Sequence, residues 1–460
     1  MGFVGANFLR ANDSRRQNIG KIMSADLVRA RIDEGSVVPL MWLVVLLGFL
    51  LNLADGIDVV AMSVTAPSVA ASWGLERAAL GPLFSAALLG MAIGAAGLAP
   101  LSDQLGRRLL LVAAMFLVGL SMLAVSWIAS MASVTVFAIL RFVSGLGIGV
   151  IFGCAPALAS EFMPSRHRSL AVSLVVMGYP VGAVLAGPIA NTLIPDYGWT
   201  AVFAAGGVLT LLIGVIAWAL LPESPEFLAG RAGYRPEREA AVNGLLARLS
   251  RDAVSGISAN VTRPRATPVA QILTSARRLK TLVLWAIYFM GFLTMYFMLS
   301  WIPTLFVDAG YTRAQGIEAL TGFNLGAIPG ILILAVLTTR LPLVPLLSLF
   351  FLSAGGVLLY VGLTEPTALG NLMLLMFIGG VFLHGGFTCL YALATQAYPS
   401  DVRAAGVGWA AGLGRTGAIA SPLLAAALVS AGWGMYSLFL SFALPLVMGG
   451  LLLWVFAGEQ

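Results

Sequence analysis

The sequence predicts an all-α membrane protein with twelve transmembrane helices arranged in two six-helix, pseudo-symmetric halves. Three observations carry this prediction: an apolar composition, apolar runs of spanning length, and an internal repeat. Of the 460 residues, 59% are hydrophobic and only 10% are charged, whereas about 25% of the residues of a soluble globular protein are charged. The chain has too little polar surface to face water, so lipid must cover much of it.

The apolar residues come in long runs, and a helix needs about 20 mainly apolar residues to cross a bilayer. Lipid admits only helices and closed barrels, and these runs are too long and too uniformly apolar for barrel strands. The expected helices are 40–64, 80–101, 109–128, 134–159, 170–193, 199–221, 281–307, 319–338, 342–361, 371–397, 405–429 and 435–456.

A polar stretch in the middle of the chain divides it into two bundles. The tail before the first helix has no apolar core, so it is not expected to be a cleavable signal peptide, and a short amphipathic helix is expected near 22–32. The expected divisions are an N-terminal tail at 1–38, a six-helix bundle at 39–221, a central loop at 222–280, a second bundle at 281–456 and a C-terminus at 457–460.

Lys and Arg are distributed unevenly along the chain. If the N-terminus is cytoplasmic, the tail and the central loop carry most of the 26 basic residues on that side, and the outer loops hold only Arg77 and Arg313. By the positive-inside rule, both termini are expected to lie in the cytoplasm. We expect a multi-pass protein of the bacterial cytoplasmic (inner) membrane. This bias explains the net charge of +6 and requires no nucleic-acid partner.

An internal repeat relates the two halves. A shift of 235 positions overlays 141–168 on 376–403, with ten of the 28 positions identical. Parallel repeats are typical of transporters that rock one half against the other about a site near the midplane. Cys154 and Cys389 match each other, which favours packing roles over a disulfide or metal site. Arg141 and His384 have no ionisable counterpart, and a buried charge in one half only points to function.

Five ionisable side chains fall well inside the predicted helices, and each Asp or Arg there costs about 2.5–3.5 kcal/mol unless it is paired or hydrated. Asp55 and Asp58 are three residues apart and share a helix face. Two neighbouring carboxylates resist being ionised together, so at least one is expected to carry a proton. The alternative is a structural salt bridge to Arg141.

Arg141 and Arg415 are candidates to bind a substrate carboxylate through two hydrogen bonds each, or else to act as counter-ions of the aspartates. His384 is either a ligand or relay or a packing residue. Aromatic residues repeat every four positions along the seventh predicted helix, which suits an aromatic substrate or helix packing. They are Tyr288, Phe292 and Tyr296.

The loop after the second predicted helix, APLSDQLGRRLLL, combines an acid, a turn glycine and two arginines. We expect it to join an ionic network that latches the two halves on the cytoplasmic side and breaks as they rock; the alternative is a solvated loop. The expected gating residues are Asp103, Gly106, Arg107, Arg108, Glu161, Arg168 and Arg403.

Motifs of nucleotide and metal chemistry are absent from the sequence. GLGIG at 145–149 lies within an apolar run with no strand before it, so it is not a dinucleotide fingerprint, and its glycines are expected to allow close helix contact. There is no Walker loop, HExxH motif or catalytic-triad signature. We therefore expect a protein that is not an enzyme, has no cofactor and uses protons as its coupling ion.

Several of these segments resemble the signatures of the major facilitator superfamily. PLSDQLGRR resembles the loop signature between helices 2 and 3, with Ala99 in place of the usual Gly and Gln104 in place of the usual Arg. RFVSGLGIG and GYPVGAVLAGP resemble the signatures of helices 4 and 5. PESPEFL resembles the segment after helix 6, with Glu226 where Arg is common. The resemblance covers nearly the whole chain.

Within this superfamily, ADGIDVVAM resembles the helix 1 signature of the aromatic acid:proton symporters. The central loop and the segments WIPTLF and ATQAYPSDVRAAGVGWAAGLGRTGAIASP also resemble that family. LTTRLPLVPL lacks the acid and glycine that this family often repeats after helix 8. The resemblance implies that helices 1, 4, 7 and 10 line the cavity. It also implies proton-coupled uptake of a small organic anion, most specifically a benzoate or hydroxybenzoate. The alternatives are a proton-coupled exporter of drugs or metabolites and a membrane receptor or lipid-modifying enzyme. Separately, we expect a functional monomer.

Overall fold

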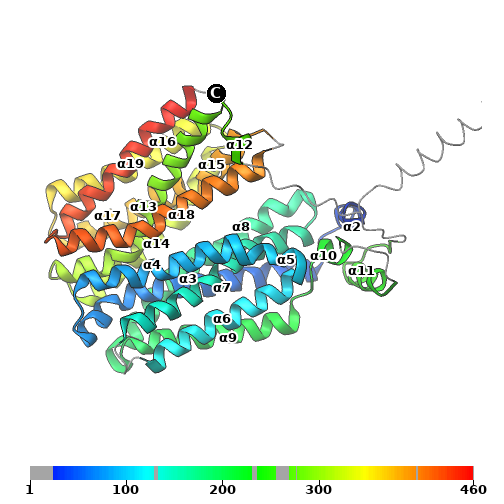
Figure 1. Cartoon of the computed structure of the whole chain (residues 1–460), viewed down its shortest axis with the longest axis horizontal. Coiled ribbons are helices and arrows are strands. Elements are labelled where there is room, and N and C mark those ends of the chain that lie inside the picture. The colour runs from blue at the N-terminus through cyan, green and yellow to red at the C-terminus, as the bar shows by residue number, and fades with distance from the viewer. Residues whose placement is uncertain are drawn as a thin grey trace, which may run out of the picture.

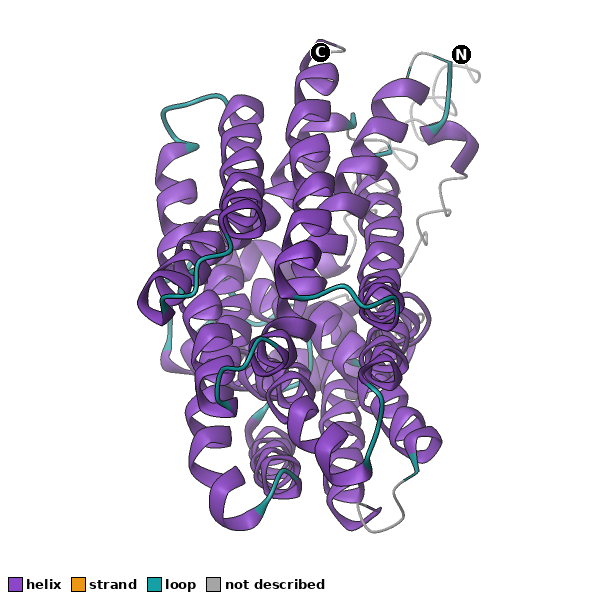
Figure 2. Ribbon diagram, turned by 90° about the vertical axis from the view of Figure 1, so that its left-hand side faces the viewer, coloured by secondary structure: helices purple, strands orange, loops and turns teal. Residues whose placement is uncertain are grey.

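The computed structural model describes residues 24–128, 133–230, 236–254, 269–275, 277–399 and 402–458. Over these residues the regular structure is entirely helical (Figures 1 and 2). Twelve helices are long and apolar enough to cross a membrane, which confirms the predicted fold class. The tail up to residue 23, much of the central loop and the last two residues of the chain lie outside the described residues.

The first half contains six spanning segments, the second of which is built from five consecutive helical pieces. Its helices are α3 (Pro39–Trp73), η1 (Arg77–Ala79), α4 (Leu80–Ile93), η2 (Gly94–Leu98), η3 (Ala99–Leu101), α5 (Ser102–Leu105), α6 (Arg107–Ile128), α7 (Val134–Phe162), η5 (Ser165–His167), α8 (Arg168–Tyr197) and α9 (Thr200–Leu220).

The second half also has six spanning segments, and α14 and α15 form one of them. Its helices are α13 (Arg278–Asp308), α14 (Arg313–Leu325), α15 (Ala327–Leu337), α16 (Leu343–Thr364), α17 (Leu369–Ala397), α18 (Arg403–Ser430) and α19 (Met435–Gly458). Four short helices lie outside the spans: α2 (Ser24–Asp33), α10 (Pro225–Gly230), α11 (Pro236–Arg248) and α12 (Val269–Ile272).

Two helices extend beyond their predicted ranges for identifiable reasons. The first was expected to end at residue 64, but α3 continues through Pro67 to Trp73 and ends where Gly74 turns left-handed, with φ of 61°. Proline removes a single backbone donor, and transmembrane helices tolerate this loss. The eighth span starts at Arg313 because Thr312 and Gln315 form a capping box.

The two halves are packed in the same way. In the first half α3 packs on α8, α4 on α7 and α6 on α9; in the second α13 packs on α18, α15 on α17 and α16 on α19. These pairs occupy equivalent positions in the repeat, so the internal repeat predicted from 141–168 and 376–403 is present in the fold. Both matched cysteines are free thiols.

The halves meet through α4 with α18, α8 with α14 and α3 with α13. Figure 1 shows them diverging toward the end that carries α2, α10 and α11, which is also where α19 ends. We call this end the terminal face. Near the opposite end Arg77 pairs with Asp308 at 2.8 Å, and the Ser85 hydroxyl donates to the Ile419 carbonyl at 2.8 Å. The halves are therefore joined away from the terminal face.

Close helix contact in the first half depends on the GLGIG glycines, as the sequence predicts. A Cβ atom added to Gly145 would lie 2.1 Å from the Ala87 carbonyl oxygen of α4, and one added to Gly149 would lie 2.3 Å from that of Met91. Since these atoms belong to backbone, no side-chain movement can relieve the overlap.

Gly145→Ala is expected to lower stability, because α4 must move away from α7 and overpacking costs about 1–3 kcal/mol. The matched control is Gly356→Ala on α16, where an added Cβ meets nothing within 4 Å. Thermal unfolding of the detergent-solubilised protein should show a clear decrease in Tm for the first variant only. Equal Tm values for the two variants would contradict this account of the contact.

Candidate functional site

A buried ion pair joins α3 to α7 in the first half. Arg141 Nη1 donates to Asp58 Oδ1 at 2.8 Å, and Nη2 donates to the Asp58 carbonyl at 3.2 Å. The Ser144 hydroxyl donates to Asp58 Oδ2 at 2.9 Å. All three residues are at most 2% exposed. Both oxygens of Asp58 thus accept hydrogen bonds from donors of α7.

Asp55 lies one helical turn away but in a very different environment. It is 1% exposed, and among the described residues neither carboxylate oxygen has a hydrogen-bond partner. Burying an unpaired charge is so costly that a carboxyl group in such a place takes the neutral, protonated form. Asp58 and Arg415 are the charged groups that act on it. The two aspartates therefore differ in their hydrogen-bond partners: Asp58 has three donors, and Asp55 has none among the described residues.

Arg415 reaches across from α18 to the first half. Its Nη1 donates to the Met91 carbonyl at 3.3 Å, and its guanidinium lies 5.5 Å from the centre of the Phe152 ring. The side chain is half-buried. Within the described part of the chain this is its single hydrogen bond, and a guanidinium has five N–H donors, so Arg415 can still bind a carboxylate with two of them.

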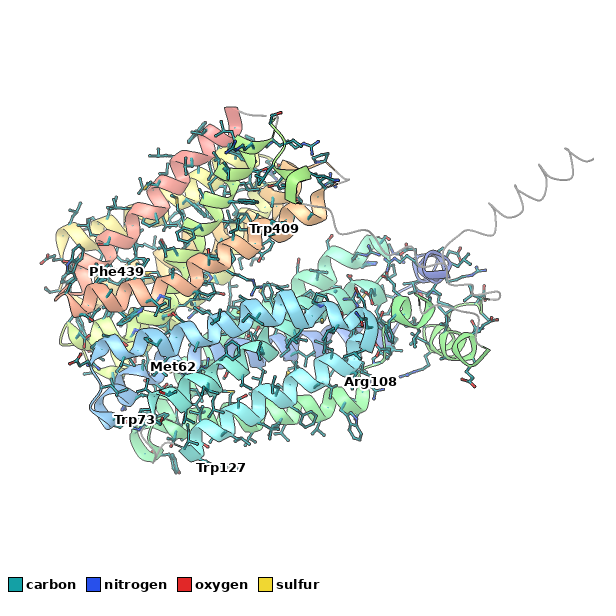
Figure 3. All side chains as sticks on the ribbon, in the orientation of Figure 1. Met62, Trp73, Arg108, Trp127, Trp409 and Phe439 are labelled. Atoms are coloured by element: carbon teal, nitrogen blue, oxygen red, sulfur yellow. The ribbon has the colours of Figure 1, made fainter. Side chains whose placement is uncertain are left out.

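A cavity lies between the two halves next to these charges. Its wall comes from α3, α4, α7 and α13, and includes Arg141 and Tyr296 among mainly apolar side chains. Met62, labelled in Figure 3, belongs to the same wall. The wall therefore draws on both halves, as a site for alternating access requires.

The aromatic stripe of α13 is divided between packing and the cavity. Tyr288 and Phe292 stack at 6.2 Å and are buried, and Phe292 also lies 4.6 Å from Phe387 of α17. A Cβ atom added at Gly414 of α18 would come within 2.8 Å of the Phe292 ring. Tyr296 alone of the three lines the cavity. In this conformation the packing role applies to Tyr288 and Phe292.

His384 is buried in the second half, away from the charge cluster. Its ring lies 4.9 Å from that of Phe323 on α14, and it does not line the cavity. Its Nε2 atom has no hydrogen-bond partner among the described residues. In this conformation the packing alternative describes His384 better than a ligand role does.

Gly106 begins an ionic network at the terminal face of the first half. It adopts φ of 99°, a left-handed value that favours glycine. Glu223 then accepts from the backbone N–H groups of Arg107 at 2.8 Å and Arg108 at 3.1 Å. This carboxylate caps the N-terminus of α6, where a negative charge is favourable. The Arg108 side chain, labelled in Figure 3, donates to the Trp218 carbonyl at 2.6 Å.

Glu161, at the end of α7, connects this loop to the segment after α9. It forms an ion pair with the Arg107 side chain and accepts a hydrogen bond from the Ser224 hydroxyl. Asp103 is exposed, and Arg403 donates to the Tyr398 carbonyl within the second half. The contacts described here lie within single halves, so they do not latch the halves together in this conformation. The predicted latch would need another state.

The short helix α2 extends the same network. Arg29 donates to the carbonyls of Ser160, Glu161 and Met163, which end α7. Asp33 accepts from the backbone N–H of Ser165 at 2.7 Å and from its hydroxyl at 2.8 Å. Burial alone would raise the pKa of Asp33. The hydrogen bonds from Ser165 and the charges of Arg29 and Arg168 outweigh this effect and hold the pKa below its usual value. The helix is thereby fastened to the turn between α7 and α8.

The sequence analysis did not single out several of these groups. Ser144 follows Arg141 by three residues and so shares its helix face, a signal that was available. Glu223 and Ser224 belong to the PESPEFL segment, but nothing in the segment indicates which charges it meets. No signal marks Arg77 and Asp308 as partners. Within the described residues, no group of three or more His, Cys, Asp or Glu side chains is placed to hold a metal ion.

Comparison with known sequences and structures agrees with this architecture. The sequence profile of the Major Facilitator Superfamily matches residues 45–364. The chain is 35% identical to the 4-hydroxybenzoate transporter PcaK of Pseudomonas aeruginosa over 421 residues, covering 91% of this chain and 93% of the relative. It is also 35% identical to a gallate transporter of Pseudomonas putida over 422 residues, covering 91% and 92%.

Among solved structures, the inward open conformation of the xylose transporter XylE from E. coli superimposes with a TM-score of 0.70. The sequence identity is 18%, and the match covers 90% of this chain and 96% of XylE. At this identity the likeness concerns the fold. The matched profile and the full-length relatives show that this chain belongs to the major facilitator superfamily.

Proposed function

We propose that this protein is a proton-coupled transporter that takes up a small aromatic carboxylate across the bacterial cytoplasmic membrane. It is a transporter and not an enzyme, in line with its family. The substrate class comes from relatives named as transporters of 4-hydroxybenzoate, gallate and benzoate. One observation carries the proposal. At the contact between the two halves, the buried carboxyl group of Asp55 has no hydrogen-bond partner among the described residues, and it lies close to Arg415, whose guanidinium makes a single hydrogen bond there.

The terminal face is the cytoplasmic face in this proposal, and both termini are cytoplasmic. Arg107, Arg108, Arg166 and Arg168 lie on that side, which accords with the positive-inside rule. The halves diverge toward the cytoplasm and meet on the outside through Arg77 and Asp308 (Figure 1). Uptake then requires these outer contacts to open and the cytoplasmic ends to close. A single chain supplies both halves, so a monomer suffices.

The two aspartates have different roles in coupling. Asp58 is the fixed partner of Arg141 and Ser144, whereas Asp55 takes up a proton from the outside and releases it inside. Arg415 binds the substrate carboxylate. When Asp55 is ionised, it competes with the substrate for the charge of Arg415. When Asp55 is protonated, Arg415 is left to the substrate, so proton binding and substrate binding favour each other.

The direct test is uptake of radiolabelled 4-hydroxybenzoate into proteoliposomes of the purified protein. With a pH gradient that is alkaline inside, we expect saturable accumulation above equilibrium, and a protonophore should abolish the accumulation. Liposomes without protein and a labelled sugar serve as controls. Uptake no faster than in protein-free liposomes, or accumulation that the protonophore leaves unchanged, would refute the proposal.

A further inference from the structure

Two serine hydroxyls face the cavity from opposite halves. Ser63 lies on α3 and Ser300 on α13, and both line the cavity among apolar side chains such as Phe84, Leu88 and Leu299. They are 3% and 5% exposed. The other polar groups of the wall are Arg141, which is engaged by Asp58, and Tyr296. The serines therefore supply two of the few polar groups that a ligand would meet there.

Both hydroxyls lack the bond that a helical serine or threonine ordinarily makes. Such side chains can donate to a carbonyl one turn back along their own helix, as Thr65 does to Ala61 at 2.7 Å. Thr294, on the same helix as Ser300, donates to the Phe442 carbonyl at 2.8 Å. Neither Ser63 nor Ser300 makes a hydrogen bond within the described part of the chain, and both line the cavity. Since an unsatisfied buried hydroxyl is costly, they are available to a bound molecule.

The position of the two serines relative to Arg415 suits the end of an aromatic acid that lies opposite its carboxylate. Met91 lines the cavity, and its carbonyl accepts from Arg415, so the guanidinium lies next to the cavity wall. Ser300 is one turn beyond Tyr296 on α13. One turn of helix rises about 5.4 Å, which is close to the distance between the carboxyl carbon and the para oxygen of 4-hydroxybenzoate. A ring held by its carboxylate at Arg415 and lying along Tyr296 would place its far end near the serines.

We propose that Ser63 and Ser300 form a hydroxyl-binding pair that recognises the ring hydroxyl of a hydroxylated aromatic acid, an inference that rests on the proposed function. A phenolic hydroxyl both donates and accepts, and each serine can do the same. One serine accepts the phenolic proton and the other donates to the phenolic oxygen. An unsubstituted acid leaves both serines without partners, and a site built in this way discriminates against the analogue that lacks the hydroxyl.

The test compares 4-hydroxybenzoate with benzoate in proteoliposomes of Ser63→Ala, Ser300→Ala and the double variant. Each single change should raise KM for 4-hydroxybenzoate roughly fivefold, which corresponds to about 1 kcal/mol for one hydrogen bond, and the double change roughly 25-fold. KM for benzoate should stay the same or fall. The matched control is Ser441→Ala on α19, whose hydroxyl bonds its own helix at the Ser437 carbonyl.

The possible outcomes separate this inference from the proposed function. If the wild-type protein takes up neither acid, both fail. If it takes up 4-hydroxybenzoate but the variants change KM for the two acids equally or not at all, the serine pair alone is refuted. Ser300→Thr keeps the hydroxyl and is expected to keep the preference for the hydroxylated acid. This variant provides the comparison should an alanine variant fold poorly.

Discussion

Asp55→Asn should abolish proton-driven accumulation of the substrate while leaving the protein folded and able to exchange substrate. Asn is close to Asp in size and cannot ionise, so it mimics the protonated state that the buried, unpartnered site favours. Substrate can still bind to Arg415, and the halves can still rock. Only the coupling to the proton is removed, so uphill uptake is expected to fall to the level of protein-free liposomes.

Two assays in the same proteoliposomes measure the separate steps. Uptake driven by a pH gradient reports coupling, and counterflow of labelled against unlabelled substrate reports binding and rocking without net proton movement. Asp58→Asn is the matched control, because it removes the same charge from a carboxylate bound by Arg141 and Ser144. We expect that variant to lose stability and counterflow as well. Uphill uptake by Asp55→Asn at the wild-type level would exclude Asp55 as the proton carrier.

Replacing Arg141 should be among the most damaging changes to stability. Removing one partner of a buried ion pair costs about 3–5 kcal/mol, because the other charge remains buried without compensation. Arg141→Met should leave the carboxylate of Asp58 buried without its charged partner. Arg141→Lys keeps the charge but cannot bond both the side chain and the carbonyl of Asp58 through one planar group. We expect both variants to show a large decrease in Tm and loss of uptake.

A double-mutant cycle distinguishes the ion pair from a general packing defect. In Asp58→Asn/Arg141→Met no charge is left unpaired, so the double variant should be more stable than Arg141→Met alone. Thermal unfolding in detergent measures all four corners of the cycle. If the effects of the two single changes simply add, Asp58 and Arg141 are not coupled, and this account of the pair is wrong.

Much of the architecture could be predicted from the sequence because it depends on local composition. Apolar runs of spanning length predicted the twelve helices, and the match of 141–168 to 376–403 predicted two halves of the same build. The cost of burying charge identified Asp55, Asp58, Arg141, His384 and Arg415 as residues that need an explanation. Helix ends were less certain, since α3 continues past Pro67 to a left-handed glycine.

Only the tertiary structure determined which of these residues contact one another. Spacing places Asp55 and Asp58 on one helix face, but which of them meets Arg141 depends on how α3 and α7 are rotated, across 83 residues of sequence. The same holds for the aromatic stripe, of which Tyr296 alone of the three lines the cavity, and for Glu161, whose partners lie in its own half. A helix presents side chains in all directions, and only the packing of its neighbours determines which of them meet a charge, a cavity or lipid.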